Sequence, residues 1–405
     1  MQSEFITEFK DQMLDRLAMA GVDTSVVDPV KFHDYCISKL KSEDLVIYNN
    51  VKQTNYDIDS LKLVDMVMYS KTKPIITGYN TLFHNHNKAE NIPGGFLDYL
   101  KATRSAAKKQ MHHHTNDTDR TLFNAFETKQ LIMKLLANSY YGAFGQGSFH
   151  FFNVLLGPSV TAQGRQLISS AILGFEGFLG DNIFFYEFDE LVQFIGNICK
   201  EEQDDEMVVE TEFDIDAEAV AERLLSRCKF KLTETQEEYL NMVLENQTET
   251  GLQKLYFKNN LFKFLEVDVI KEAISDNLVV NGFHDANSPP EDIKEILAEI
   301  SSILRYFVGY PYPYNAKTNH AATMTRKVVL VCDTDSNFLH VYPWLQYVCR
   351  VSDIDIPTID NDTRVSIISI MTYFITQFID EVFKILCANS NVPEAEHHRI
   401  NMKSE

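Results

Sequence analysis

Apolar and polar residues repeat with a helical period over most of the chain. Apolar residues recur every three to four positions, which places them on one face of a helix. This period predicts helices in six stretches: residues 5–20, 59–69, 96–111, 122–139, 159–179 and 361–388. Residues 181–325 are acidic and mostly helical in pattern, so we expect them to form an inserted helical subdomain.

A strand-like period occurs in two places. Residues 73–87 (KPIITGYNTLFHNHN) predict short strands interrupted at Gly78. Residues 327–341 (KVVLVCDTDSNFLHV) predict a β-hairpin, because an apolar run leads into a polar turn and apolar alternation resumes at Phe338. The turn of this hairpin contains two carboxylates, Asp333 and Asp335.

These two carboxylates allow four interpretations. One is a tight turn, since Asp, Thr and Ser bond their own backbone. A calcium loop is excluded, because Phe338 and Trp344 stand at positions 6 and 12, where that loop needs Gly and Glu. A glycosidase-type acid and base need separated carboxyls in unlike environments, which one hairpin tip supplies poorly. The fourth is a divalent-metal platform with Asp333 and Asp335 as hard oxygen ligands.

Composition narrows the class of protein. A chain of 405 residues, 45% hydrophobic and 12% aromatic, can form the cores of two or three domains. No run of 18 apolar residues predicts a membrane span, and the first residues do not resemble a secretory signal. The six cysteines show no CxxC spacing, so we expect buried thiols in a reducing cytoplasm.

Charge is distributed unevenly along the chain. The net charge of −21 argues against a nucleic-acid partner, and residues 201–222 contain no Lys or Arg. Residues 101–134, in contrast, contain seven basic side chains. A local basic stripe can bind phosphate within an acidic protein, so the net charge does not exclude nucleic acid.

Two basic helices carry a second candidate site. Lys134, Asn138 and Tyr141 are spaced i, i+4 and i+7 and therefore project from one helix face, and Arg104 and Lys108 are spaced i, i+4 on the preceding helix. If the helices are antiparallel, both stripes can line one cleft, where the cations suit a triphosphate and the ring suits a sugar or base. A solvated helix face explains each pair taken alone.

At these positions the chain resembles family B (polymerase-alpha-like) DNA polymerases. Residues 134–142 (KLLANSYYG) resemble the fingers motif of that family, and residues 333–336 (DTDS) resemble its metal-binding palm motif. Residues 159–165 (SVTAQGR) resemble the palm helix that follows the fingers. The resemblance covers roughly residues 75–180 and 320–405, in the family's order, and the long acidic span between the motifs resembles versions from large bacteriophages.

The resemblance implies a role for each candidate residue. It makes Asp333 and Asp335 the catalytic carboxylates that hold two Mg²⁺ ions, with Asp335 favoured as the direct ligand. It assigns five residues to the incoming dNTP: Arg104, Lys108 and Lys134 to the triphosphate, Asn138 to its positioning, and Tyr141 to a place beneath the nascent base pair. The implied reaction is DNA-templated addition of dNTPs to a primer 3′ end.

The sequence departs from the family pattern at the palm. Val331-Cys332 replaces the usual Tyr-Gly, and no stretch reads Asp-x-x-Ser-Leu-Tyr-Pro-Ser, where the family has another palm Asp. Asp23 keeps only the Asp-to-Pro spacing, and Asp57 keeps Asp-x-x-Ser-Leu but is followed by Lys-Leu. Asp59 reads better as a helix N-cap.

These departures, and the lack of exonuclease and thumb segments, lead us to expect one subunit of a split polymerase. Separate chains would supply the missing palm Asp, the exonuclease and the thumb, and primer–template DNA and dNTPs would be the other partners, with no membrane involved. We expect the apolar stripe of residues 5–20 and a strand starting near Ile400 to face those chains. The expected location is the cytoplasm, that of the host cell for a viral protein.

Two other functions are compatible with the same motifs. A non-catalytic DNA- or partner-binding module derived from a polymerase is the main alternative, although such a module has no need of a metal-binding pair. A protein-primed polymerase would carry its extra segment before the fingers motif, whereas here the insertion follows it.

The expected fold class is α+β, with a helical fingers hairpin on a partial antiparallel-sheet palm and a mostly helical acidic insertion. The expected domains are five: an N-terminal palm-associated region (1–92), the fingers hairpin (93–145), a palm helix (146–180), the insertion (181–325), and the palm hairpin with its following helix (326–405).

Overall fold

The computed structural model divides the chain into two compact units. It describes residues 4–49, 52–69, 71, 73–85, 92–200, 207–278, 283, 286, 289–309, 320–333, 336–400 and 402. The core unit comprises Met1–Lys73 and Leu167–Glu405, and the hairpin unit comprises Pro74–Gln166.

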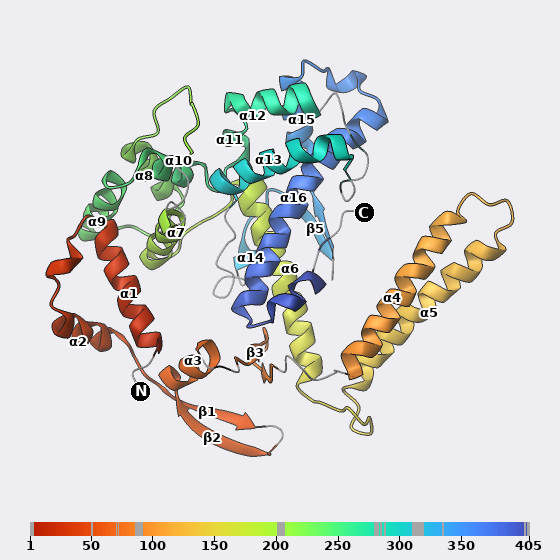
Figure 1. The fold of residues 1–405 in the computed structure, drawn as a ribbon, viewed down its shortest axis with the longest axis horizontal. Coiled ribbons are helices and arrows are strands. Elements are labelled where there is room, and N and C mark those ends of the chain that lie inside the picture. The colour runs from red at the N-terminus through yellow and green to blue at the C-terminus, as the bar shows by residue number, and fades with distance from the viewer. Residues whose placement is uncertain are drawn as a thin grey trace. The chain divides into compact units, whose positions relative to one another are not determined.

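Two long antiparallel helices form the hairpin unit, α4 (Ile92–His113) and α5 (Thr121–Ala143) (Figure 1). The ring of Phe96 on α4 meets that of Tyr140 on α5 edge-on, with centroids 4.9 Å apart. Tyr140 also packs against Phe144, at 5.0 Å. The Phe96–Tyr140 contact joins the two helices at the end opposite to their connecting loop.

The short strands predicted around Gly78 are present in the same unit. β3 (Ile75–Ile76) pairs antiparallel with β4 (Leu82–Phe83). The backbone of Gly78 lies against the first turns of α6 (Leu156–Gly180), where its N–H donates to Gln163 Oε1 at 3.0 Å. A Cβ at this position would lie 3.0 Å from the carbonyl oxygen of Ala162, so glycine permits the close approach.

The centre of the core unit is a pair of helices, α16 (Asn361–Asn389) and the second half of α6 (Figure 1). Phe178 of α6 stacks on Phe378 of α16 with ring centroids 4.5 Å apart. Gly174 allows this approach, since a Cβ there would lie 3.3 Å from side-chain atoms of Phe378 and Ile379. By length and composition α16 could cross a membrane, but 56% of its apolar window is buried inside the protein, as in a core helix.

Helices between the two central ones in sequence pack around them. They are α7 (Phe188–Lys200), α8 (Ala217–Ser226), α9 (Glu234–Glu245), α10 (Glu249–Phe257), α11 (Leu261–Phe264), α12 (Asp268–Glu272), the π-helical turn η2 (Ala273–Leu278), α13 (Glu291–Phe307) and α14 (His320–Thr323). Leu224, Phe257 and Leu304 from this region belong to one hydrophobic cluster with residues of α6 and α16. The acidic span therefore buries its apolar residues in the same core as the central helices.

The N-terminal part of the core unit contains both helices and a hairpin. Its elements are α1 (Glu4–Met19), the 3₁₀ turn η1 (Thr24–Val26), α2 (Pro29–Lys39), β1 (Asp44–Asn49), β2 (Thr54–Asp59) and α3 (Ser60–Met68). Residues 5–20, expected to face other chains, also contact other segments of this chain. The backbone N–H of Phe5 donates to Asp65 of α3 at 3.2 Å, and the hydroxyl of Tyr239 on α9 donates to the carbonyl of Arg16 at 2.9 Å.

The C-terminal part begins with the predicted hairpin. Its elements are β5 (Val329–Asp333), β6 (Ser336–Leu339), α15 (Tyr342–Val351), the 3₁₀ turn η3 (Ile356–Thr358), α16, and the 3₁₀ helix η4 (Glu394–Arg399). The strand expected near Ile400 is not confirmed. The residues before Ile400 form η4, and Asn401 and residues 403–405 lie outside the described part of the chain.

The α+β fold class is confirmed. Helices dominate, and the strands that the structure describes form three separate two-stranded antiparallel sheets, β1–β2, β3–β4 and β5–β6.

Candidate active site

The β5–β6 hairpin is buried at its root and exposed towards its tip. Val329 at the start of β5 is 1% exposed, whereas Leu330 and Val331 are 64% and 56% exposed. Phe338 on β6 pairs with Val331 and is 63% exposed. The pairing register shifts between Val329 and Val331, so the ladder of the hairpin is irregular at this point.

The structure confirms the predicted hairpin and places Asp333 at its end. Asp333 is the last residue of β5, pairs with Ser336 across the hairpin, and is exposed. Asp335, together with Thr334, lies outside the described residues.

The donor chemistry at this tip fits Mg²⁺. That ion is usually bound by one or two carboxylates together with waters and substrate phosphates, so an exposed Asp at the end of a strand is a suitable ligand. Among the residues that the structure describes, no group of three or more His, Cys, Asp or Glu side chains is placed to hold a metal. The described part of the chain therefore offers Asp333 as a ligand but no complete protein cage.

Arg104 faces the second basic helix. Its Nε lies 3.5 Å from Gln130 Oε1, so the guanidinium lies level with Gln130, one helical turn before Lys134. Because α4 and α5 are antiparallel, Lys108 lies one turn nearer to the connecting loop, beyond Gln130. The helix pair thus brings Arg104 alongside the stripe of Lys134, with Lys108 further along the hairpin.

Lys134 and Asn138 project from α5 as exposed side chains. Within the described ranges, neither of them nor Lys108 has a hydrogen-bond or ion-pair partner, and Arg104 pairs with an amide and not with a carboxylate. A cation that is not neutralised by the protein remains available to an anionic ligand.

Tyr141 is held in place through its hydroxyl. Its Oη donates to the carbonyl of Gly157 at 3.0 Å and lies 2.8 Å from Thr161 Oγ1, both at the start of α6. The side chain is nevertheless 40% exposed, so part of its ring faces solvent. The fixed hydroxyl gives this ring a defined orientation at the C-terminal end of α5.

The two groups of candidate residues belong to different units. The five predicted nucleotide-binding residues lie in the hairpin unit, and Asp333 lies in the core unit. The helix pair α4–α5 thus carries the five nucleotide-binding candidates, and the strand pair β5–β6 carries Asp333.

The two stretches considered for a further palm Asp differ in structure. Asp23 caps η1, where its carboxylate accepts from the backbone N–H of Ser25 at 2.9 Å. Its hydrogen bonds with the Ser25 hydroxyl and backbone lower the pKa of Asp23. Asp59 caps α3 through the backbone N–H of Lys62, as predicted. Asp57 instead lies in β2, opposite Val46, without a capping role.

One polar residue of this region was missed by the sequence reasoning. Glu176 on α6 is fully buried, and its carboxylate accepts from backbone N–H groups at the root of β5. The signal in the sequence is a single acidic residue within the apolar stretch 171–179 (AILGFEGFL). A buried carboxylate needs hydrogen-bond donors, but the sequence does not show which donors those are.

Two family models match the chain. DNA polymerase family B matches residues 12–176, a range that includes α4, α5 and Asp57. Divergent Family B DNA polymerase matches residues 222–405, a range that includes the β5–β6 hairpin and most of the acidic span. No curated protein and no solved structure matches the chain. The matched ranges are wider than those over which the motifs alone carry the resemblance.

Proposed function

Because this chain is a divergent, family B polymerase-like protein, we propose that it takes part in templated extension of a primer 3′ end with dNTPs. The observation that carries this proposal is the basic stripe of the hairpin unit. The chain has 58 acidic and 37 basic residues, yet Arg104, Lys108 and Lys134 have no carboxylate partner among the described residues. Unneutralised cations in so acidic a protein favour an anionic ligand.

The residues of the helix pair would bind the incoming nucleotide. Arg104, Lys108 and Lys134 would contact the triphosphate, where guanidinium and ammonium groups form charge-assisted hydrogen bonds with phosphate oxygens. Asn138, one turn beyond Lys134, would orient the nucleotide. The ring of Tyr141 would lie beneath the nascent base pair, with its hydroxyl already engaged by α6.

The hairpin tip would hold the metals. Asp333, at the end of β5, and Asp335 would bind two Mg²⁺ ions as hard oxygen ligands. When bound, these ions stabilise charge on the attacking 3′ oxygen and on the leaving pyrophosphate. The protein's own part is positioning, since phosphoryl transfer depends on the geometry of the charges around it.

We further propose that the site is completed by other chains. Leu330, Val331 and Phe338 expose apolar side chains on a sheet of only two strands, a surface suited to an added strand. A partner strand bearing the missing palm Asp would cover these residues and add a ligand. In this proposal the exonuclease and thumb also come from partner chains.

The proposed location is the cytoplasm, that of the host cell for a viral protein. All six cysteines are free thiols, as in proteins that act in a reducing compartment.

The alternative is a non-catalytic binding module derived from a polymerase. The observation that favours it is that the described residues form no cluster of three metal-ligating side chains. The two functions differ in what they require of the hairpin tip, because binding to DNA does not depend on its carboxylates.

Primer extension by the reconstituted assembly tests the proposal. The chain, co-expressed with candidate partner chains, should extend a labelled primer with Mg²⁺, and Asp333→Ala should abolish extension while leaving DNA binding intact. Asp214→Ala, a change at an exposed Asp of the same unit, is the matched control. DNA binding without extension in every combination of chains would support the binding module instead.

A further inference from the structure

Glu176 is a buried side chain of the core that accepts four hydrogen bonds. Its Oε1 accepts the backbone N–H groups of Val328 at 2.9 Å and Val329 at 2.8 Å. Its Oε2 accepts the backbone N–H of Lys327 at 2.8 Å and the side-chain amide of Asn182 at 2.7 Å. Three successive amides at the root of β5 therefore point at one carboxylate.

Burial of a carboxylate is unfavourable unless its oxygens accept hydrogen bonds. Glu176 has 0% exposure and lies among apolar residues of α6, where an unpaired charge would be strongly destabilising. Its four donors satisfy both oxygens, and hydrogen bonds to a charged acceptor are stronger than those between neutral groups. An apolar residue would fill the same space but would leave the three amides of β5 without acceptors.

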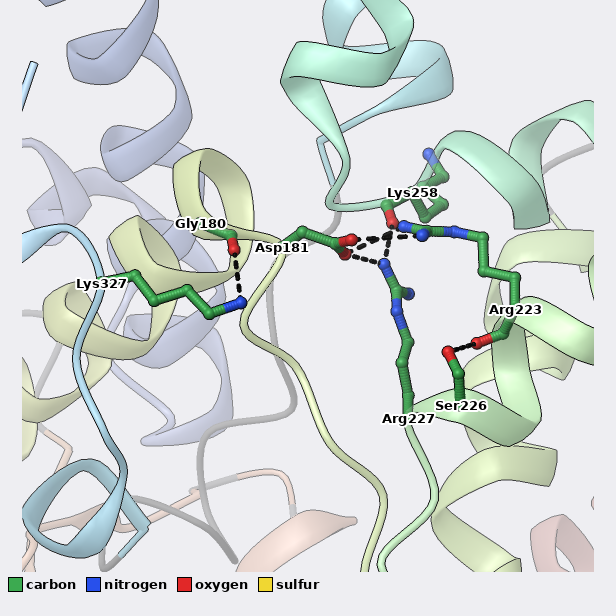
Figure 2. Close-up of polar contacts among 7 residues, drawn as sticks. All are labelled: Gly180, Asp181, Arg223, Ser226, Arg227, Lys258 and Lys327. Carbon is green, nitrogen blue, oxygen red and sulfur yellow. Dashed lines mark hydrogen bonds and ion pairs between the residues drawn. The ribbon is translucent and has the colours of Figure 1, made fainter. Parts of the chain in front are cut away.

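Further contacts hold the same junction between α6 and β5. Asn182 donates to the carbonyl of Thr325 at 2.9 Å, so its amide joins Glu176 to the chain just before β5. The ammonium group of Lys327 donates to the carbonyl of Gly180, the last residue of α6, at 3.3 Å (Figure 2). The segment that leads into β5 is thus held at the carbonyl of Thr325, at the side chain of Lys327 and at the backbone N–H groups of residues 327–329.

Asp181, the residue after α6, connects this junction between α6 and β5 to the C-terminal end of α8. Figure 2 shows that Asp181 binds the guanidinium groups of Arg223 and Arg227, and that Arg227 also contacts the carbonyl of Lys258. The distance from Arg227 to this carbonyl is 3.2 Å. Arg227 is almost fully buried, and this burial lowers its pKa to about 10. The end of α6 is therefore held on one side by β5 and on the other by the end of α8.

We propose that Glu176 is a positioning residue for Asp333 of the β5–β6 hairpin, an inference that rests on the proposed polymerase function. The clamp, meaning the hydrogen bonds from residues 327–329 to Glu176, acts just before the register shift, and Asp333 follows Val329 by four residues along one strand. Asp333 is joined to Val329 through this strand and pairs with Ser336 across the hairpin, so a shift of the root displaces the tip. Misplacement of a reacting group by about 1 Å can cost about 10²-fold in rate.

Hydrogen exchange of the full-length chain tests the clamp without reference to activity. Glu176→Gln replaces one acceptor oxygen by a donor, so the amides of residues 327–329 should exchange about tenfold faster or more. The matched control is Gln253→Met, a neutral change of similar size, because Gln253 is also buried and holds the backbone of Val209 through two hydrogen bonds of 2.9 Å. This control should leave exchange at residues 327–329 unchanged. Unchanged exchange in Glu176→Gln, or an equal rise in both variants, would overturn the clamp.

Steady-state kinetics of the reconstituted assembly test the positioning role. Glu176→Gln should lower kcat by about tenfold or more and raise the Mg²⁺ concentration needed for half-maximal rate, with the dNTP KM within about twofold of wild type. Gln253→Met should change none of these values at temperatures where both variants are folded. Faster exchange with unchanged kcat would overturn the positioning role. A wild-type assembly without activity would refute the proposed function, and the exchange result would still decide whether the clamp exists.

Discussion

The root of the β5–β6 hairpin and the α4–α5 helix pair differ in whether their charged side chains have partners within the chain. At the root of β5, Glu176 is buried and every acceptor position that it offers is used by a donor of the same chain. On the helix pair, Lys134 is exposed and has no partner among the described residues. A satisfied charge fixes structure, whereas an unsatisfied charge remains available to a ligand. The root of β5 therefore has the properties of a region that positions other residues, and the α4–α5 helix pair has those of a region that binds an anionic ligand.

The largest effect is expected from loss of a metal ligand. Asp335→Ala in the assembled enzyme should lower kcat by about 10²-fold or more, since a metal ion supplies several kcal/mol of charge stabilisation in such reactions. DNA affinity should change little, which a fluorescence-anisotropy titration would show. Asp57→Asn belongs in the same experiment. An equal loss there would mean that this chain supplies its own third carboxylate and that no partner Asp is required.

A smaller effect is expected at the surface proposed for a partner strand. Phe338→Ser should weaken association with the palm-completing chain by about tenfold to 100-fold. This is the effect expected when an apolar side chain is lost whose burial contributes about 1.5–3 kcal/mol to the binding free energy. Analytical ultracentrifugation of the mixed chains would measure the change. Tyr99→Ser is the control, because Tyr99 is 62% exposed, close to the 63% of Phe338, but lies on α4. If the isolated chain is monomeric and extends primers unaided, the assembly is unnecessary and this prediction fails.

The helix pair should respond through substrate binding. Lys134→Ala should raise the apparent KM for dNTP about tenfold with a lesser fall in kcat, because a charge-assisted contact with the triphosphate is lost. Lys129→Ala on the same helix is the control for a change in net charge alone. Equal effects of the two substitutions would show that the basic stripe acts through its overall positive charge and not through a specific contact of Lys134.

The smallest effect concerns a cap far from either region. Asp360 caps α16 by accepting from the backbone N–H of Thr363 at 2.7 Å, and its hydrogen bonds with Thr363 lower its pKa. An Asp whose pKa is lower in the folded state stabilises the protein above its unfolded pKa, and this stabilisation is lost as the pH falls through the folded value. Asp360→Ala should therefore lower the melting temperature slightly at pH 7, and the difference from wild type should shrink as the pH falls below the ordinary Asp pKa of about 3.9. A constant difference at every pH would show that charge has no part in this cap.

Elements with strong local patterns could be predicted from the sequence. The apolar period predicted α1, α5, α6 and α16 to within a few residues, because a helix is formed by neighbours three and four positions apart. The N-cap at Asp59 and the β5–β6 hairpin followed from equally local rules. The spacing of Lys134, Asn138 and Tyr141 likewise placed them on one stripe, since that spacing is a property of the helix itself.

Contacts between distant segments were decided only by the tertiary structure. Glu176 meets the root of β5 across more than 150 positions of sequence, and no periodicity connects the two. The partners of α1 were missed for the same reason, since Asp65 and Tyr239 are distant in the chain. Local hydrogen bonding determines which elements form, but burial determines which elements meet. The sequence therefore contained the candidate carboxylates and cations, and the packing of the core determined what holds them in place.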